Sequence, residues 1–253
     1  MSYHVDRADD AGVEAAREVI GCARPDVLVL QGPGAKPVFE TVRETWTTPG
    51  TNPIWEEVLE DGRTPGRLAI LSRFPIAARH SRKDLGYRIK EDQLFLRHGI
   101  ADVTLLVSDQ VLFRLVAVDL KDKVFHRLGQ TEMRRNECRL VARHLRKAVA
   151  GTPGARFLLA GTFNDRPDSA AVSEILKQKE PALSDVRPVD EHGDAWTAYN
   201  ASVDEYYRHD YFFVVAALAE SVVRAQTRVV DHPRAREAST RRALLVTLRI
   251  PKE

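Results

Sequence analysis

The sequence predicts an α+β sandwich, and two observations lead to that prediction. Short apolar segments typical of strands mix with amphipathic helices, without the regular strand-helix alternation of a doubly wound parallel sheet. In the middle of the chain, apolar segments at 99–107 and 111–120 flank Ser108-Asp109-Gln110, which suits a hairpin turn. That pair of strands is antiparallel, which again favours α+β.

The first half of the chain begins with a helix and a strand. Amphipathic periodicity predicts a helix at 9–22, and the run DVLVLQ at 26–31, which follows Pro25, is typical of a buried strand. A second helix at 36–46 follows the same periodicity. The remaining predicted strands of this half lie at 68–72, before Pro75, and at 94–96, 99–107 and 111–120.

The second half opens with the longest predicted helix, 130–150. Apolar positions recur there every four residues, and arginines fill the other faces, where we expect them to be solvated. The elements predicted after it are a strand at 156–160, a helix at 168–178, and strands at 195–199, 208–215, 221–230 and 243–250.

The composition is that of a globular protein. With 253 residues, 43% of them hydrophobic, the chain can bury a large core, and we expect residues 1–253 to form a single domain. Its 38 Lys and Arg residues against 36 Asp and Glu give a formal charge of +2, without the strong basic bias of proteins that hold nucleic acid by phosphate attraction.

Cysteine usage and hydropathy bear on the compartment. Cys22 and Cys138 both fall in predicted helices, which argues against a disulfide framework and favours a reducing compartment. No apolar run approaches the roughly 18 residues of a membrane span, and the first residues lack a signal-peptide layout. A cytoplasmic protein is therefore expected.

Six motifs follow one another along nearly the whole chain. They are RPDVLVLQ (24–31), GRLAILSRFPI (66–76), LVAVDLKDK (115–123), LLAGTFNDRPDS (158–169), YRHDYFFV (207–214) and EASTRRALLVTL (237–248). In this order they resemble the endonuclease/exonuclease/phosphatase superfamily, which has the DNase-I-like fold. The resemblance implies a four-layer α/β/β/α sandwich of two packed mixed sheets flanked by helices. It also implies an active site at one end of the sheets, where phosphoester bonds are cleaved with Mg²⁺ or Mn²⁺.

That chemistry needs particular residue types. A hard divalent cation prefers carboxylate oxygens, a base must take a proton from water, and donors such as His and Asn stabilise charge on the phosphoryl oxygens. At several positions where the resemblance places the family's functional residues, this sequence has a different residue type. His4 stands where the first strand usually has Asn, Gly32 replaces the metal-binding Glu, Asp119 replaces a His, and Thr162 replaces the Asp that activates water.

The terminal motif also differs from the family pattern. The usual Ser-Asp-His appears as Ser239-Thr240-Arg241, so both the aspartate and the catalytic histidine are replaced. The pair Asp231-His232 imitates that motif, but the strand ALLVTL that should follow it comes later, so we interpret the pair as exposed turn residues.

Other family positions are retained, namely Leu120, Lys121, Asn164, Asp165 and Asp210. Because the ligand, the base and the catalytic histidine are absent together, the first hypothesis is a catalytically degenerate protein that binds Mg²⁺ poorly and needs no cofactor. Arg241 is predicted to pair with Asp210 in the histidine's place and to close part of the cleft. Lys121, Asn164 and Arg241 then form a candidate site for a phosphate-containing ligand, unless neighbouring residues satisfy them.

Two alternatives stay open. In the second hypothesis the protein is an active hydrolase with a recast site, in which His4, Asp119 and Asp165 hold Zn²⁺ or Mn²⁺. His209 is not expected to join them, because it should point away from Asp210 along the same strand. In the third, the sandwich is a non-catalytic scaffold or interaction module. The sequence does not choose among nucleic acid and smaller phosphoesters as ancestral substrates.

Overall fold

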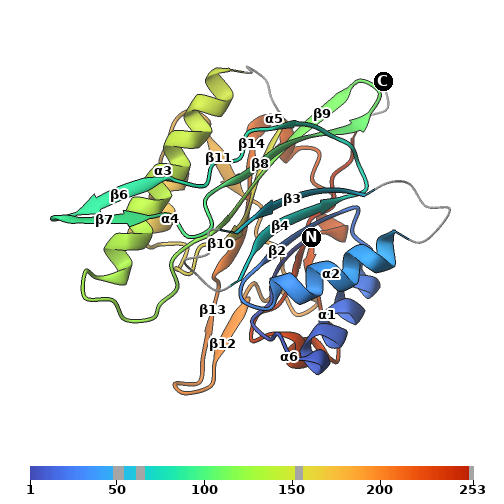
Figure 1. Ribbon diagram of the computed structural model, residues 1–253. Helices are drawn as coiled ribbons and strands as arrows, with labels where there is room; N and C mark the ends of the chain where they lie inside the picture. Colours follow the sequence, from blue (N-terminus) through green and yellow to red (C-terminus); the bar gives the residue numbers. More distant parts are fainter. Residues whose placement is uncertain (48–53, 61–65, 152–155, 251–253) are drawn as a thin grey trace.

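The structure is a computed structural model that describes residues 1–47, 54–60, 66–151 and 156–250. Figure 1 shows two β-sheets packed face to face, with helices on the outer side of each. The four-layer α/β/β/α sandwich predicted from the sequence is therefore confirmed. Within these ranges, no helix is both long and apolar enough to cross a membrane.

The first sheet carries the N-terminal strands and has the strand order β15-β16-β1-β2-β4-β3. Only β1 and β2 pair in parallel, so the sheet is mixed. Its strands are β1 (Ser2–His4), β2 (Val27–Gln31), β3 (Trp55–Leu59), β4 (Leu68–Ser72), β15 (Arg228–Val229) and β16 (Leu244–Leu245). Helices α1 (Asp10–Ala23) and α2 (Ala35–Trp46) cover its outer face.

The second sheet has the order β11-β14-β10-β9-β8-β5, and in it β9 and β10 run in parallel. Its strands are β5 (Ile76–Arg79), β8 (Ala101–Ser108), β9 (Val111–Asp119), β10 (Phe157–Thr162), β11 (Leu183–Asp185) and β14 (Asp210–Val215). Helices α3 (Gln130–Ala150) and α4 (Ala170–Leu176) cover it.

Small elements complete the described chain. They are the hairpins β6 (Gly86–Ile89) with β7 (Asp92–Phe95) and β12 (Ala198–Asn200) with β13 (Glu205–Tyr207), the short helices α5 (Ala216–Ala219) and α6 (Ala235–Ala238), and the 3₁₀ helix η1 (Arg224–Gln226).

Side-chain alternation along the central strands builds the layers. On β2, Leu28 and Leu30 pack with the α1 and α2 helices, whereas Val29 belongs to the core that also contains the second sheet. Successive residues of a strand point to opposite faces, so a continuous apolar run serves a sheet that is buried on both sides. This explains why DVLVLQ is typical of a buried strand.

Several helix ends follow local signals. The Asp9 carboxylate accepts a hydrogen bond from the Gly12 N–H at 2.9 Å and so caps α1. Ser169 caps α4 in the same way, accepting from the Val172 N–H at 3.2 Å. The Ser169 cap places the start of α4 at Ala170, two residues later than the sequence predicts.

The sequence predictions fail mainly for short strands. The strands β3, β5, β6, β11 and β13 are not predicted, and 94–96 and 195–199 are displaced versions of β7 and β12. The segment 221–230 is not one strand, because η1 interrupts it before β15, and 243–250 keeps only β16 as regular strand. Strands of two to five residues such as these take their pairing from tertiary neighbours, which a local pattern does not reveal.

Candidate functional site

The candidate site lies at one end of the sandwich, where five strand ends meet. His4 ends β1, Gly32 follows β2, Asp119 ends β9, Thr162 ends β10, and Asp210 begins β14. In the second sheet, Thr162 is in register with Asp119 on one side and with Asp210 on the other. Residues that face one another across neighbouring strands point to the same face, so these three side chains lie side by side.

His4 reaches the same point from the opposite sheet. Its Nδ1 lies 3.3 Å from the Thr162 hydroxyl and 3.8 Å from the Asp119 carboxylate. Burial, followed by the positive charge of Arg241, holds the pKa of His4 well below its usual range, so the imidazole is neutral near pH 7. The structure thus brings together four residues that the sequence placed in the site.

Asp210 is the centre of a closed hydrogen-bond network. Its carboxylate accepts hydrogen bonds from the hydroxyls of Thr162 and Thr197, both at 2.6 Å. The Nη1 of Arg241 lies 3.5 Å from the same carboxylate, and its Nη2 donates to the Asn164 side-chain oxygen at 2.6 Å. The ion pair predicted between Arg241 and Asp210 is therefore present, and the Asp210 side chain is only 5% exposed.

Asn164 is held at both ends of its amide. The nitrogen donates to the Leu120 carbonyl at 2.8 Å, while the oxygen accepts from Arg241. Its φ of 54° lies in the left-handed region, which Asn tolerates better than most residues. The turn after β10 thereby turns the Asn164 side chain back into the site.

Gly32 lies where a side chain would collide with its neighbours. A Cβ at this position would lie 2.7 Å from His4 Nε2 and 2.6 Å from the Val5 carbonyl oxygen. Its φ of +93° also suits glycine rather than a residue with a side chain. The imidazole of His4 and the adjacent backbone thus occupy the space in which a glutamate side chain would begin.

Asp119 differs from Asp210 in that its carboxylate has no hydrogen-bond donor among the described residues. It is fully buried, and neither carboxylate oxygen accepts a hydrogen bond there. His4 and His98 stand beside it, the latter with Nε2 at 3.9 Å. Burial raises the pKa of Asp119 to about 6, against the opposing effect of the Arg97 and Arg241 charges.

Asp165 does not join His4 and Asp119. Its carboxylate accepts a hydrogen bond from the Nε of Arg134 at 2.9 Å, and Arg134 is a buried residue of α3. Within the described ranges, no group of three or more His, Cys, Asp or Glu residues is arranged to hold a metal ion. The prediction that these three residues converge is wrong, because a buried arginine binds Asp165 instead. The donor set does not fit Mg²⁺, Mn²⁺ or Zn²⁺.

Two further predicted positions point away from this cluster. Thr240 is exposed, and its backbone N–H and hydroxyl donate to Asp6. The Lys121 ammonium pairs with its neighbour Asp122, while its backbone N–H donates to Glu137 at 2.7 Å. Of the three candidate ligand-binding residues, the structure therefore joins only Asn164 and Arg241.

His209 and the pair Asp231-His232 lie outside the hydrogen-bond network of Asp210. The His209 ring is buried and stacks on Tyr207 with the ring centres 5.3 Å apart, and it is not among the partners of Asp210. Burial and the charge of Arg241 lower its pKa to about 2. Asp231 is exposed and His232 Nδ1 accepts from the Arg234 N–H, as expected for turn residues.

Three residues that contact Asp210, Asp119 or Asp165 are not predicted from the sequence. Thr197, His98 and Arg134 come from a loop, a left-handed turn and a helix, and none lies in one of the six motifs. Arg134 carried a usable signal, because it lies on the apolar side of α3 next to buried Met133 and Cys138. Thr197 and His98 carried none, since they reach the site only through the fold.

The comparisons with known proteins agree with this placement of the strands. The family model described as "Endonuclease/Exonuclease/phosphatase family" matches residues 5–232. This chain belongs to that family. No curated protein matches its sequence.

Solved structures that resemble this family member share its fold at low sequence identity. The 3′ phosphatase NExo from Neisseria, bound to product DNA hairpin, is 14% identical over 98% of this chain and 97% of that one, with a TM-score of 0.70. Truncated Caenorhabditis elegans TDP2 is 13% identical over 92% and 88%, with a TM-score of 0.63. The human Nocturnin catalytic domain with bound sulfate is 14% identical over 94% and 87%, with a TM-score of 0.62. These likenesses show the fold alone.

Proposed function

We propose that this chain is a catalytically degenerate member of the family, whose own side chains fill the former phosphoesterase site. The observation that carries the proposal is the closed network around Asp210. Thr162, Thr197 and Arg241 use its carboxylate, so it is not free to orient an imidazole. A guanidinium keeps its proton at all ordinary pH values and so does not replace histidine in proton transfer.

The metal-binding side of the site supports the same proposal. The place of the glutamate ligand is taken by His4, whose Nε2 would lie 2.7 Å from a Cβ at Gly32. Thr162, at the position of the base, donates a hydrogen bond from its hydroxyl to Asp210 at 2.6 Å, and a threonine hydroxyl does not take a proton from water as a carboxylate does. Losing one general base commonly lowers the rate about 10²- to 10⁴-fold, and these losses fall on residues that act as a unit.

The first experiment is a hydrolysis assay. Bis-p-nitrophenyl phosphate and a DNA hairpin carrying a 3′ phosphate are incubated with the protein and Mg²⁺, Mn²⁺ or Zn²⁺. We expect rates at the buffer background with every ion. Metal-dependent turnover that disappears both with chelator and in Asp119→Ala would overturn the proposal in favour of the active hydrolase with a recast site.

A restoration experiment tests the assignment of positions. The set Gly32→Glu, Asp119→His, Thr162→Asp, Thr240→Asp and Arg241→His returns the family's residue types. The structure adds His4→Asn, because the imidazole occupies the space that the restored glutamate side chain would need. We expect Mg²⁺ to raise the melting temperature of the six-fold variant more than that of the five-fold variant. A folded six-fold variant indifferent to Mg²⁺ would contradict the assignment.

Residual phosphate binding is a second candidate function. The Nη2 of Arg241 lies 2.6 Å from the side-chain oxygen of Asn164. Among the structural neighbours, the human Nocturnin catalytic domain carries a bound sulfate. A phosphate bound at Arg241 competes with Asp210, so only weak binding, with a Kd of about 1 mM or more, is expected. Isothermal titration calorimetry with inorganic phosphate, on the wild type and on Arg241→Gln, tests this binding. Equal affinity in both proteins would exclude this site.

The scaffold interpretation stays a hypothesis. It gains support from Val124 and Phe125, adjacent residues of the loop after β9 that are 67% and 83% exposed. Apolar side chains on the surface become informative only when they form a contiguous patch. Two neighbouring residues do not define a partner.

A further inference from the structure

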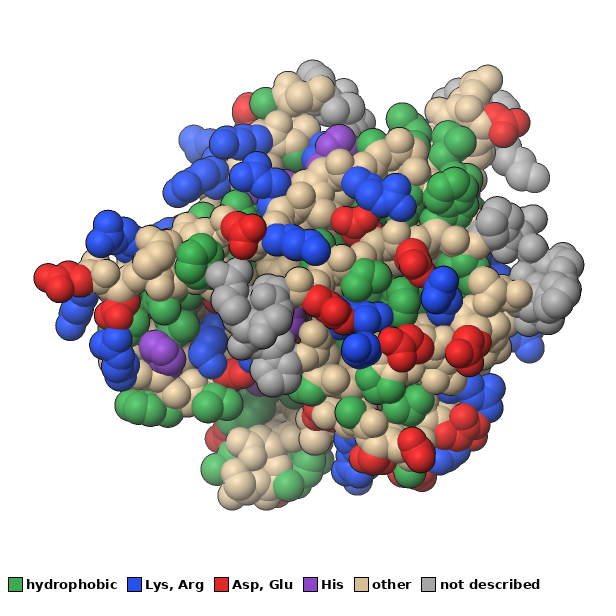
Figure 2. All heavy atoms as spheres, viewed as in Figure 1, with side chains coloured by type: hydrophobic (Ala, Val, Ile, Leu, Met, Phe, Trp, Pro, Cys, Tyr) green, Lys and Arg blue, Asp and Glu red, His purple; other side chains and the backbone are tan. Residues whose placement is uncertain are grey.

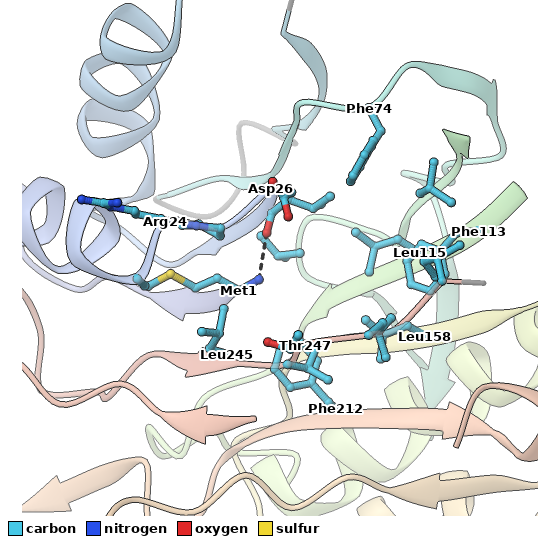
Figure 3. A pocket seen from close by; sticks show the side chains of 18 residues that line it. Met1, Arg24, Asp26, Phe74, Phe113, Leu115, Leu158, Phe212, Leu245 and Thr247 are labelled. Atoms are coloured by element: carbon cyan, nitrogen blue, oxygen red, sulfur yellow. Dashed lines mark hydrogen bonds between the residues drawn. The ribbon is translucent and has the colours of Figure 1, made fainter. Parts of the chain in front are cut away.

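A cavity of about 340 Å³ opens at the end of the sandwich opposite the Asp210 network. Strand direction fixes its place. It is lined by Val27 at the start of β2 and Leu158 near the start of β10, whereas Gly32 and Thr162 lie at the other ends of the same strands. Figure 3 shows its lining residues from close by. Neither the family's chemistry nor the proposed function uses this cavity.

Both sheets supply apolar walls to the cavity. Leu115, Leu158 and Phe212 come from the second sheet, and Val29 and Leu245 from the first. Each of these side chains is buried, with at most 8% of its surface exposed. The cavity is therefore an opening into the core between the sheets, and its deep surface offers a ligand only van der Waals contacts.

The mouth of the cavity is also apolar, and it is open to water. The early end of β16 creates it, because the chain leaves the sheet after Leu245 and runs beside Ser221 and Val223, bonding to them through backbone atoms. The apolar rim residues, all partly exposed, are Val27, Phe74, Val107, Val246, Leu248 and Ile250. Covering apolar surface is favourable by about 25 cal/mol per Å², so a fitting ligand gains free energy here.

The charged groups lie on one side of the mouth, and the hydroxyl of Thr247 lies on another side, next to Leu245. On the charged side, Arg24 and Asp26 are exposed, and the Met1 nitrogen donates to the Val27 carbonyl at 2.8 Å. In Figure 3, Arg24 extends away from the wall formed by Phe113 and Leu158. Arg24 carries a positive charge and Asp26 a negative charge at this edge, so the two charges do not favour one sign of ligand charge.

We propose that this cavity binds a small, uncharged, mainly apolar molecule. Its ring or alkyl body lies against Phe113, Leu158 and Phe212, and a single hydrogen-bonding group faces Asp26. The volume of about 340 Å³ is at the lower end of the range of small-molecule sites, about 300–1,000 Å³, which limits the ligand to one short alkyl chain or two to three aromatic rings.

The test uses N-phenyl-1-naphthylamine, a neutral dye that brightens in apolar surroundings. We expect saturable binding to one site with a Kd of about 10 μM, a value ordinary for a small apolar ligand. Val246→Trp places an indole in the mouth and should weaken binding at least about tenfold, or about 1.4 kcal/mol. Val203→Trp is the matched control, because Val203 lies on the β12–β13 turn, is 55% exposed and does not line the cavity.

Competition distinguishes the ligand class. 1-Decanol should displace the dye at lower concentration than decanoate, which carries a full charge. Stronger displacement by decanoate would contradict the uncharged class. Binding without saturation, or binding equal in wild type and Val246→Trp, would overturn the proposal and indicate adventitious adsorption of the dye.

A second variant covers a failure of Val246→Trp to fold. Val107→Trp fills the mouth from β8 of the other sheet, and circular dichroism checks its fold. Unaltered dye binding in a folded Val107→Trp variant would likewise overturn the proposal. Methyl NMR gives an independent readout, because the shifts of Leu115 and Leu158 should move on addition of dye and those of Leu140 on α3 should not.

Discussion

The two ends of the sandwich differ in how their side chains are packed. At the end that holds Asp210, the side chains of Thr162 and Thr197 donate to its carboxylate, and Arg241 contacts both this carboxylate and Asn164. At the other end, apolar side chains of both sheets leave a cavity of about 340 Å³ unfilled. Figure 2 shows one face of the molecule, on which charged side chains of both signs surround scattered apolar ones.

The difference follows from the cost of leaving each kind of group unpartnered. A buried polar group without a hydrogen bond costs about 1–3 kcal/mol, so most polar groups at a buried strand end need partners within the protein. Apolar walls carry no such requirement, and a cavity between them persists at the cost of lost contacts. Asp119 and the ring of His209 are exceptions at the polar end, because both are buried without a hydrogen-bond partner among the described residues.

The largest expected effect comes from opening the Asp210 network. Asp210→Ala removes the carboxylate that pairs with Arg241 and the acceptor of two threonine hydroxyls. We expect the free energy of unfolding to fall by about 3–5 kcal/mol, as when one partner of a buried ion pair is removed. Urea denaturation measures it. A loss below about 1 kcal/mol would mean that the network is solvated and contributes little.

The apolar end should be more tolerant than the packed layer beside it. Leu158 lines the cavity, whereas its fully buried neighbour Leu159 points to the other face of the sheet. Leu159→Ala should cost about 4 kcal/mol and Leu158→Ala about 2 kcal/mol, values near the two ends of the range for buried leucines. Thermal unfolding of both variants checks this. Equal losses would indicate that the cavity walls are as tightly packed as the core.

At the polar end, Asp119 should make the free energy of unfolding depend on pH. Because burial raises its folded pKa to about 6, above the ordinary value, the charged form destabilises the fold at high pH. Asp119→Asn should therefore be more stable than wild type by about 2 kcal/mol at pH 8, and the gain should fade between pH 6 and pH 4. Urea denaturation at a series of pH values measures the difference.

A neighbouring aspartate serves as the control for that experiment. Burial alone would raise the pKa of Asp122, but the hydrogen bond from Lys121 and the charge of Arg97 hold it below its usual value. Asp122→Asn should therefore lose stability at neutral pH, the opposite sign, and the loss should disappear as the pH falls through the lowered pKa. The same sign in both variants would refute the account of Asp119.

The smallest effect is expected at Lys121. Its ammonium pairs with Asp122 and is 18% exposed, so Lys121→Ala should change the free energy of unfolding by only about 0.5 kcal/mol. Calorimetric titration of the same variant with phosphate shows whether Lys121 contributes to phosphate binding. If phosphate binding weakens as much as in Arg241→Gln, then Lys121 belongs to the site despite its pairing with Asp122.

Much of the fold was predictable because its signals are local. The helix at 130–150 matches α3 residue for residue, and the DVLVLQ and LVAVDLKDK motifs contain β2 and the end of β9. The strands that failed, such as β6 and β15, are too short for periodicity to show, and their pairing depends on the tertiary structure around them. For the site, strand-end motifs predicted the cluster of His4, Asp119, Thr162 and Asp210.

The sequence by itself determined which residue types stand at the strand ends and in the motifs that follow them. Only the tertiary structure decided how these residues contact one another. Gly32 makes room for His4, Arg241 joins Asp210 to Asn164, and Arg134 takes Asp165 away from the cluster. These pairings join segments up to 77 residues apart or lying in facing sheets, so they follow from packing and not from local pattern. The far cavity has the same origin, because it depends on where β16 ends relative to the opposite sheet.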